Sequence, residues 1–165
     1  MMRYLLDANV FIQAKNLHYG FDFCPAFWEW LIDANARECV FSIEKVRDEL
    51  LAGGDELAEW ASNRAGRFFL SPDEKVLAAF SEVSGWATAQ DYDPAAINIF
   101  FQDPDYYLVA HALAHDFAVV THEVPAHTRK KLKIPNACIG LGIRHMTPYE
   151  MLRRERARFV LEKRE

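Results

Sequence analysis

Four carboxylates of the chain occupy positions from which they could form one site. They are Asp7, Glu49, Asp105 and Glu123. Asp7 directly follows the apolar run 4–6, and Glu123 lies just past the apolar run 117–120. We expect Glu49 about two turns into the helix after a second strand, and Asp105 in the first turn of the helix before the fourth. Ligands of an open parallel sheet bind beyond the carboxyl ends of its strands, so we expect the four to converge there.

Carboxylates that converge in this way require a counter-cation, because like charges at short range raise one another's pKa. Ligation by oxygen alone, without imidazole or thiolate, selects Mg²⁺ or Mn²⁺ over zinc. One such ion can hold a phosphodiester oxygen and lower the pKa of an attacking water, and a second ion would also stabilise the leaving oxygen. The residues therefore predict phosphoryl chemistry that depends on one or two Mg²⁺ or Mn²⁺ ions.

Each acid also has an ordinary structural explanation. Asp103 and Asp105 could cap a helix and complement its dipole. Glu49 could be a solvated helix residue, and Glu123 a loop acid. Asp7 is the hardest to explain in this way, because an aspartate at a strand end after two leucines is poorly placed for solvation.

His122, Glu123 and His127 form a grouping that looks like a zinc protease motif but has the wrong spacing. The zinc motif H-E-x-x-H places both imidazoles on one helix face. The spacing here is H-E-x-x-x-H, so on a helix the two histidines would diverge by roughly 140°. Pro125 between them would also disrupt the helix. The pattern therefore excludes a zinc protease site.

Short apolar segments alternate with helical ones along the chain. Strands are expected at residues 4–6, 39–41, 67–70, 117–121 and 143–146, and helices at 25–36, 43–51, 55–63, 73–91, from Pro94, 104–115 and 149–162. We expect Ser42 to cap the helix 43–51, and Asp103 and Thr147, each followed by proline, to begin the helices after them. The alternation predicts an α/β fold with a parallel sheet covered on both faces.

Length and composition favour one soluble globular domain over residues 1–165. The 165 residues are 51% hydrophobic and 13% aromatic, which argues against disorder. No stretch approaches the ~20 apolar residues that span a bilayer, and the start of the chain lacks the apolar region of a secretory signal. Cys24, Cys39 and Cys138 are scattered, which predicts reduced thiols in a cytoplasmic protein.

The net charge of −5 is unevenly distributed. Residues 1–126 carry 8 Lys+Arg against 20 Asp+Glu, whereas residues 127–165 carry 11 against 4. This asymmetry is compatible with an acidic site beside a basic binding edge. A solvated basic C-terminal helix or a partner-binding arm would explain the basic segment at about 127–165 equally well.

Four stretches, in this order, resemble the motifs of PIN-domain nucleases. They are Leu5-Leu6-Asp7-Ala8-Asn9-Val10-Phe11, Ser42 with Glu49-Leu50, residues 105–112 (DYYLVAHA) and residues 119–123 (VVTHE). The spacing from Asp105 to Thr121 is similar to that of VapC-type toxins. Residues 119–152 resemble a family of short PIN-like proteins that is catalogued as a domain of unknown function and often regarded as toxins.

This resemblance implies a three-layer α/β/α sandwich and a Mg²⁺- or Mn²⁺-dependent endoribonuclease, the toxin of a type II toxin–antitoxin pair. It implies that Asp7, Glu49, Asp105 and Glu123 bind metal and catalyse, with Asp103 as an extra or substitute ligand. It places Asn9, Ser42 and Thr121 beside the acids as supporting residues. A cognate antitoxin and a homodimer are implied partners. The fourth acid, commonly aspartate in VapC-type proteins, is glutamate here.

Basic residues that follow the fourth acid could contact RNA phosphates and offset their repulsion from the carboxylates. The candidates are Arg129, Lys130, Lys131, Lys133 and Arg144, which we expect near the end of the fifth strand. Phe21, Phe23, Tyr106 and Tyr107 could stack on unpaired bases, although aromatic residues at helical spacing usually belong to the core.

Two other functions compete with the nuclease. The first is a catalytically silent module that holds RNA or a protein partner through the basic C-terminal segment. The second is a phosphatase of the haloacid-dehalogenase type, since Asp7 ends a strand. That chemistry needs a second aspartate two residues further on, where this chain has Asn9, and the sequence therefore disfavours it.

Overall fold

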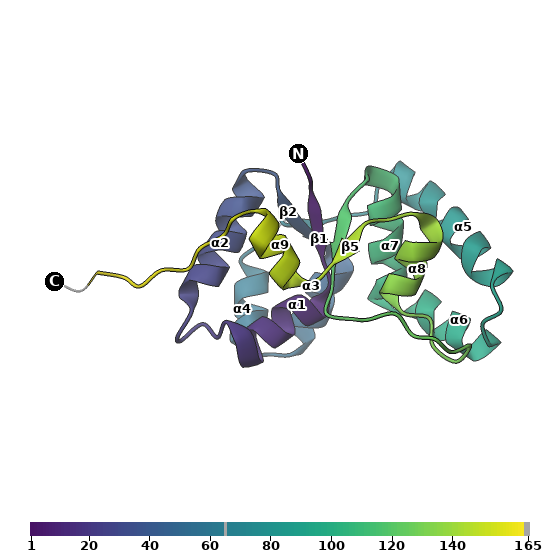
Figure 1. Ribbon diagram of the computed structural model, residues 1–165, viewed down its shortest axis with the longest axis horizontal. Helices are drawn as coiled ribbons and strands as arrows, with labels where there is room; N and C mark the ends of the chain where they lie inside the picture. The colour runs from purple at the N-terminus through teal and green to yellow at the C-terminus, as the bar shows by residue number, and fades with distance from the viewer. Residues whose placement is uncertain (65, 164–165) are drawn as a thin grey trace.

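The fold is a parallel sheet between two layers of helices, as Figure 1 shows for the computed structural model, which describes residues 1–64 and 66–163. The strands are β1 (Tyr4–Leu6), β2 (Val40–Ile43), β3 (Phe69–Leu70), β4 (Ala118–Val120) and β5 (His145–Met146). Their order in the sheet is β3-β2-β1-β4-β5, and every neighbouring pair is parallel. The predicted α/β class and three-layer α/β/α sandwich are confirmed. Residues 164–165, which end the predicted basic segment, lie outside the described part.

The central strand β1 explains why the first acid lies at one edge of the sheet. Its three residues are fully buried, as expected for a parallel strand covered on both faces. Leu6 is aligned with Val120, the last residue of β4. The amide of Asp7 then donates to the carbonyl of Val120 at 2.9 Å. The first acid therefore emerges where β1 and β4 end together.

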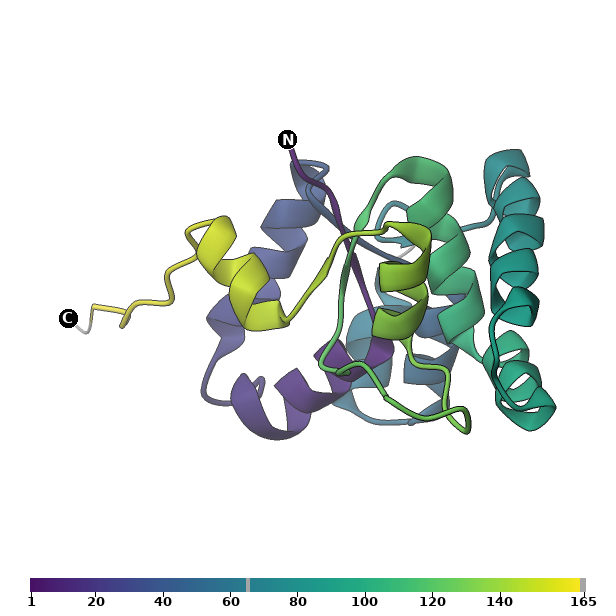
Figure 2. The same ribbon diagram turned by 45° about the vertical axis from the view of Figure 1, so that its right-hand side comes forward.

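The helices pack on both faces of this sheet. They are α1 (Ala8–Gln13), a π-helix (Ala14–His18), α2 (Pro25–Ala36), α3 (Glu44–Ala52), α4 (Glu56–Ser62), α5 (Glu74–Ala89), α6 (Pro94–Gln102), α7 (Pro104–His115), α8 (Ile134–Leu141) and α9 (Pro148–Arg154). Figures 1 and 2 show α5, α6, α7 and α8 on one side, and α1, α2, α4 and α9 on the other. No helix in the described ranges is both long and apolar enough to cross a membrane.

Local capping explains where several predicted helices begin. The side chain of Asp73 accepts from the amide of Val76 at 3.0 Å at the start of α5. Thr147 accepts from the amide of Glu150 at 3.2 Å at the start of α9, as predicted. These bonds satisfy amides that have no partner within the helix.

Aromatic packing holds α1 against the sheet and so fixes the residues around Asp7. Phe11 of α1 is fully buried. Its ring centroid lies 5.8 Å from that of Trp60 on α4, and 6.1 Å from those of both Phe68 and Phe69 at β3. Since Phe11 stands one turn after Asp7, this packing anchors the start of α1 beneath the acid.

Two predictions of local structure were wrong. Ser42 does not cap a helix, because β2 continues to Ile43, which pairs with Leu70 of β3. The last helix ends at Arg154 rather than near 162, because Arg156 adopts the left-handed φ of 55° and the chain turns away. Phe159 then packs edge-on against Tyr19, with 5.7 Å between ring centroids.

Candidate active site at the carboxyl edge of the sheet

Asp7 is the most deeply placed of the acids, with 5% of its surface exposed. It stands at the N-cap of α1, where one carboxylate oxygen accepts from the amide of Ala8 at 2.7 Å and the other from the hydroxyl of Thr121 at 2.8 Å. Burial raises the pKa of Asp7 to about 7, against the opposing effect of the Thr121 bond, and repulsion from Glu123 and Glu49 adds to the rise.

Thr121 joins the residues around Asp7 into one network. Its hydroxyl oxygen accepts from the side-chain amide of Asn9 at 3.2 Å and from the backbone amide of Glu123 at 3.1 Å. The side-chain oxygen of Asn9 accepts from the amide of His122 at 3.1 Å. Two of the three supporting residues predicted from the sequence, Asn9 and Thr121, thus connect the end of β1 to the segment that carries the fourth acid.

Asp105 faces the same edge from the first turn of α7. Burial raises its pKa to about 8, and repulsion from Asp7, Glu123, Asp103 and Glu49 adds to the rise, in that order. A carboxyl group responds in this way only when the other carboxylates lie within mutual range. Asp105 is therefore within electrostatic range of the other acids, and it lines one hollow together with Asp103 and Glu123. That all four acids form one site stays a prediction.

Glu49 and Asp103 lie at the periphery of this group. Burial and then repulsion from Asp103 raise the pKa of Glu49 on α3. Asp103 is exposed and occupies the N-cap position of α7, but its side chain accepts no capping hydrogen bond from the helix. Capping alone does not account for Asp103.

Glu123 differs from the other acids because its carboxylate already has partners. One oxygen accepts from the amide of Ile134, the first residue of α8, at 3.1 Å. The other lies 3.9 Å from the Nζ of Lys133. The longer arm of a glutamate spans the distance to the helix start, and the contact closes the loop between β4 and α8.

The acids are close enough to repel one another but do not form a ready metal site. Within residues 1–64 and 66–163, no group of three or more His, Cys, Asp or Glu side chains is arranged to hold a metal ion. The donor chemistry nonetheless fits a hard cation, since these groups are carboxylates. Burial, with repulsion added to it, raises the pKa values of Asp7 and Asp105 to about 7 and about 8. A divalent ion would require these side chains to rotate towards it.

The chain was compared with protein families, curated proteins and solved structures. It matches the model of a family described as a domain of unknown function (DUF4411) over residues 4–159. The chain belongs to the DUF4411 family. No curated protein and no solved structure matches it. The matched range in this DUF4411 protein contains all the acids of the site, together with Asn9 and Thr121.

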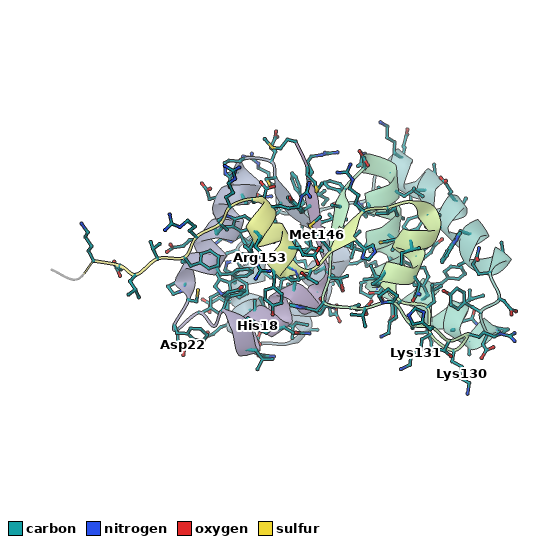
Figure 3. All side chains as sticks on the ribbon, viewed as in Figure 1. His18, Asp22, Lys130, Lys131, Met146 and Arg153 are labelled. Carbon is teal, nitrogen blue, oxygen red and sulfur yellow. The ribbon has the colours of Figure 1, made fainter. Side chains whose placement is uncertain are left out.

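Three of the predicted basic residues of this DUF4411 protein lie beside the acids. A hollow of about 300 Å³ is lined by three acids, Asp103, Asp105 and Glu123, together with three lysines, Lys130, Lys131 and Lys133. We call it the lysine-lined hollow. Figure 3 shows Lys130 and Lys131 on the loop at the end of the molecule towards which β1 runs. Ammonium groups here can hold an anion next to the carboxylates.

The other two predicted basic residues have different surroundings. Arg129 pairs with Asp91 at 3.1 Å and donates to the carbonyl of that residue at 3.0 Å, which ties the loop to the start of α6. Arg144 precedes β5 and its carbonyl binds the amide of Val119, so it lies at the amino edge of the sheet. It lines a separate hollow with Arg154 and Met2. Its predicted place near the end of the fifth strand is wrong, because β5 begins only at His145.

Ser42 and Asn136 support the DUF4411 site through the backbone. The buried hydroxyl of Ser42 donates to the carbonyl of Leu6 at 2.6 Å, directly before Asp7. The side-chain oxygen of Asn136 accepts from the amides of Ala126 and Lys133, both at 3.1 Å, and so pins the two ends of the basic loop. The sequence analysis did not predict α8 or a role for Asn136. The signal that could have revealed them is Pro135, which follows Ile134 in the first turn of α8.

Proposed function

We propose that this protein is an endoribonuclease that hydrolyses RNA phosphodiester bonds with the help of Mg²⁺ or Mn²⁺. The observation that carries the proposal is that Asp105 and Glu123 line the lysine-lined hollow, with Asp7 in electrostatic range of Asp105. Carboxylates next to ammonium groups suit a substrate that is both phosphate-bearing and hydrolysed with a cation's help.

Each residue has a defined part in this proposal. Asp7, Glu49, Asp105 and Glu123, with Asp103 as a further ligand, would hold the cation, which supplies Lewis-acid activation when bound. Thr121 and Asn9 hold Asp7 in position against the loop that follows β4. Lys130, Lys131 and Lys133 hold the phosphate backbone. Arg129 acts indirectly, because its ion pair secures the loop that carries these lysines.

Membership of the PIN-domain superfamily and a toxin role belong to the same proposal. Two observations support them. The four motifs occur in the same order, and their acids are among the carboxylates that repel one another around Asp105. A toxin of this kind would be restrained by a cognate antitoxin and would form a homodimer. We propose a cytoplasmic location, since Cys24, Cys39 and Cys138 are all free thiols in the described part of the chain.

The test is RNA cleavage in vitro by the wild type, Asp7→Asn and the control Glu82→Gln, each with Mg²⁺, with Mn²⁺ and with EDTA. Glu82 lies exposed on α5 and matches the acid-to-amide change. We expect Asp7→Asn to lose at least about 100-fold in rate, since it removes a metal ligand, and EDTA to abolish cleavage by the wild type. Full cleavage by Asp7→Asn would reject the site. Mapping RNA 5′ ends after brief induction in cells would then give the target.

One observation favours the silent binding module as a second candidate. The Glu123 carboxylate is already bonded to Ile134 and adjacent to Lys133, which leaves it less free for a metal. Saturable RNA binding without cleavage of diverse RNAs, in the presence of either ion, would select this alternative.

A further inference from the structure

A second hollow borders the carboxylate cluster at Glu49. Its volume is about 470 Å³, and its walls include the rings of Phe101 and Tyr107, the ammonium of Lys45 and the carboxylates of Asp48 and Glu49. We call it the aromatic hollow. It is large enough for a nucleoside-sized group, and its combination of ring faces with a few polar groups is typical of ligand pockets.

The turn between α6 and α7 separates the aromatic hollow from the lysine-lined hollow. Gln102 and Pro104 line the aromatic hollow, whereas Asp103 and Asp105 line the lysine-lined hollow. Successive residues of the turn therefore alternate between the two. Asp48 and Glu49 line the aromatic hollow, whereas Asp103, Asp105 and Glu123 line the lysine-lined hollow. Carboxylates therefore lie on both sides of this turn.

The charges of the two hollows suit different parts of a nucleotide. The lysine-lined hollow has three ammonium groups, which attract phosphate. The aromatic hollow has one lysine against two carboxylates, Asp48 and Glu49, so it repels phosphate and suits a neutral ring. Carboxylate and amide oxygens there can also accept from the amino groups of bases.

The side chains of Phe101 and Tyr107 are fixed by packing against neighbouring aromatic residues. The Phe101 centroid lies 4.9 Å from that of Tyr106, and the Tyr107 centroid lies 5.0 Å from that of Phe80. Lys45 places its Nζ 4.8 Å from the Tyr107 centroid. Lys45 is exposed, so an entering base can displace it from the ring, which frees its ammonium for a neighbouring phosphate.

We propose that the aromatic hollow takes one unpaired base of a single-stranded RNA, stacked on Phe101 and Tyr107, while the lysine-lined hollow holds the adjoining backbone. The strand then crosses the carboxylates between the two hollows. A paired base cannot enter, so the protein selects single-stranded over double-stranded RNA. This inference rests on the proposed function, because it names the form of RNA that the same site accepts.

The test uses binding in the Asp7→Asn background with Mg²⁺ present, so that cleavage does not interfere. The probe is a short single-stranded RNA containing 2-aminopurine, whose fluorescence is quenched by stacking, and the same RNA annealed to its complement. Phe101→Leu and Tyr107→Leu remove a ring, Phe101→Trp restores one, and Phe23→Leu is the control. Although the sequence made Phe23 a candidate for stacking, it is 66% exposed beside a different hollow at the start of α2, which none of the acids of the site line.

We expect Phe101→Leu and Tyr107→Leu each to weaken single-strand binding by about tenfold, as base–aromatic stacking predicts, and to reduce quenching. Phe101→Trp and Phe23→Leu should bind and quench as the background protein does, and the duplex should bind weakly to all. Equal binding by the leucine variants, or equal affinity for the duplex, would overturn the inference while RNA cleavage by the wild type could still stand. Failure to bind any RNA would overturn the inference together with the proposed function.

Discussion

The Thr121 hydroxyl donates a hydrogen bond of 2.8 Å to Asp7 across the boundary between β4 and β1. Residues 114 positions apart in the chain are thus joined at the point where two central strands end. The same oxygen accepts from the side-chain amide of Asn9 and from the backbone amide of Glu123. One hydroxyl therefore connects Asp7 to the backbone at Glu123. The bond stabilises the ionised form of Asp7 against the effect of burial.

Thr121→Val should therefore damage both the site and the fold. Valine has nearly the same shape but leaves the amides of Asn9 and Glu123 without their acceptor. We expect cleavage to fall by about 10- to 100-fold and the free energy of unfolding to fall by about 1–3 kcal/mol. Thr121→Ser keeps the hydroxyl and should recover most of both. RNA cleavage and urea denaturation measure the two effects, and wild-type behaviour of Thr121→Val would contradict the role of the bond.

Burial of the carboxyl groups of Asp7 and Asp105, together with repulsion from the other acids, should make stability depend on pH. The folded-state pKa values of Asp7 and Asp105, about 7 and about 8, both lie above the ordinary value of 3.8. Groups with raised pKa favour the folded state at low pH, and that contribution is lost as pH rises through the folded-state values. Metal-free protein should therefore lose thermal stability progressively between about pH 4 and 8, from the ordinary value up to the folded-state values, with no further loss from these groups above that range. Mg²⁺ should restore stability at the alkaline end.

Asp105→Asn isolates this effect. With the charge removed, the melting temperature in EDTA should decline less over the same pH range, and Mg²⁺ should stabilise the variant less. Glu82→Gln, an exposed acid on α5, should follow the wild type. A slope for Asp105→Asn as steep as that of the wild type would show that the repulsion around this carboxyl is not what destabilises the alkaline protein.

Much of this site could be predicted because its signals are local. An apolar run followed by an acid marks Asp7 and Glu123, and an aspartate followed by proline marks the start of α7 at Asp103. Hydrophobic periodicity and turn residues set helices such as α2, which matched its predicted limits. The parallel sheet then brings the ends of β1 and β4 to one edge regardless of the separation of these strands in the chain.

The predictions that failed concern positions that are set by contacts between residues far apart in the chain. Ser42 looks like a helix cap, but pairing of Ile43 with Leu70 keeps it in β2. Arg144 is predicted near the end of a strand over residues 143–146. The strand β5 comprises only His145 and Met146, so Arg144 precedes it and lies at the amino edge of the sheet. Phe159 would suit a helix face, yet its packing against Tyr19 keeps it outside α9.

Two helical glycines should respond in opposite ways to alanine. At Gly140 on α8 a Cβ would overlap the ring of Trp86, whereas at Gly85 on α5 no atom lies within 4 Å of it. Gly140→Ala should destabilise by about 1–3 kcal/mol through overpacking, and Gly85→Ala should stabilise by roughly 0.5–1 kcal/mol. Urea denaturation measures both. Trp86→Leu should relieve the cost of Gly140→Ala, and a neutral Gly140→Ala would mean that α8 does not pack on α5 this closely.

The lysine-lined hollow should account for the salt dependence of RNA binding. Lys130 and Lys131 lie beside Asp105 and Glu123, whereas Arg144 lies at the opposite edge of the sheet. Each phosphate contact contributes about 0.7 to the slope of log affinity against log salt for a single strand. Lys130→Gln combined with Lys131→Gln should therefore lower the slope by about 1.4 and weaken binding of all sequences alike. Arg144→Gln removes one positive charge from the other edge and should leave the slope unchanged. Fluorescence anisotropy across a salt series measures it, and an equal loss from Arg144→Gln would mean that RNA is held by net charge rather than by this hollow.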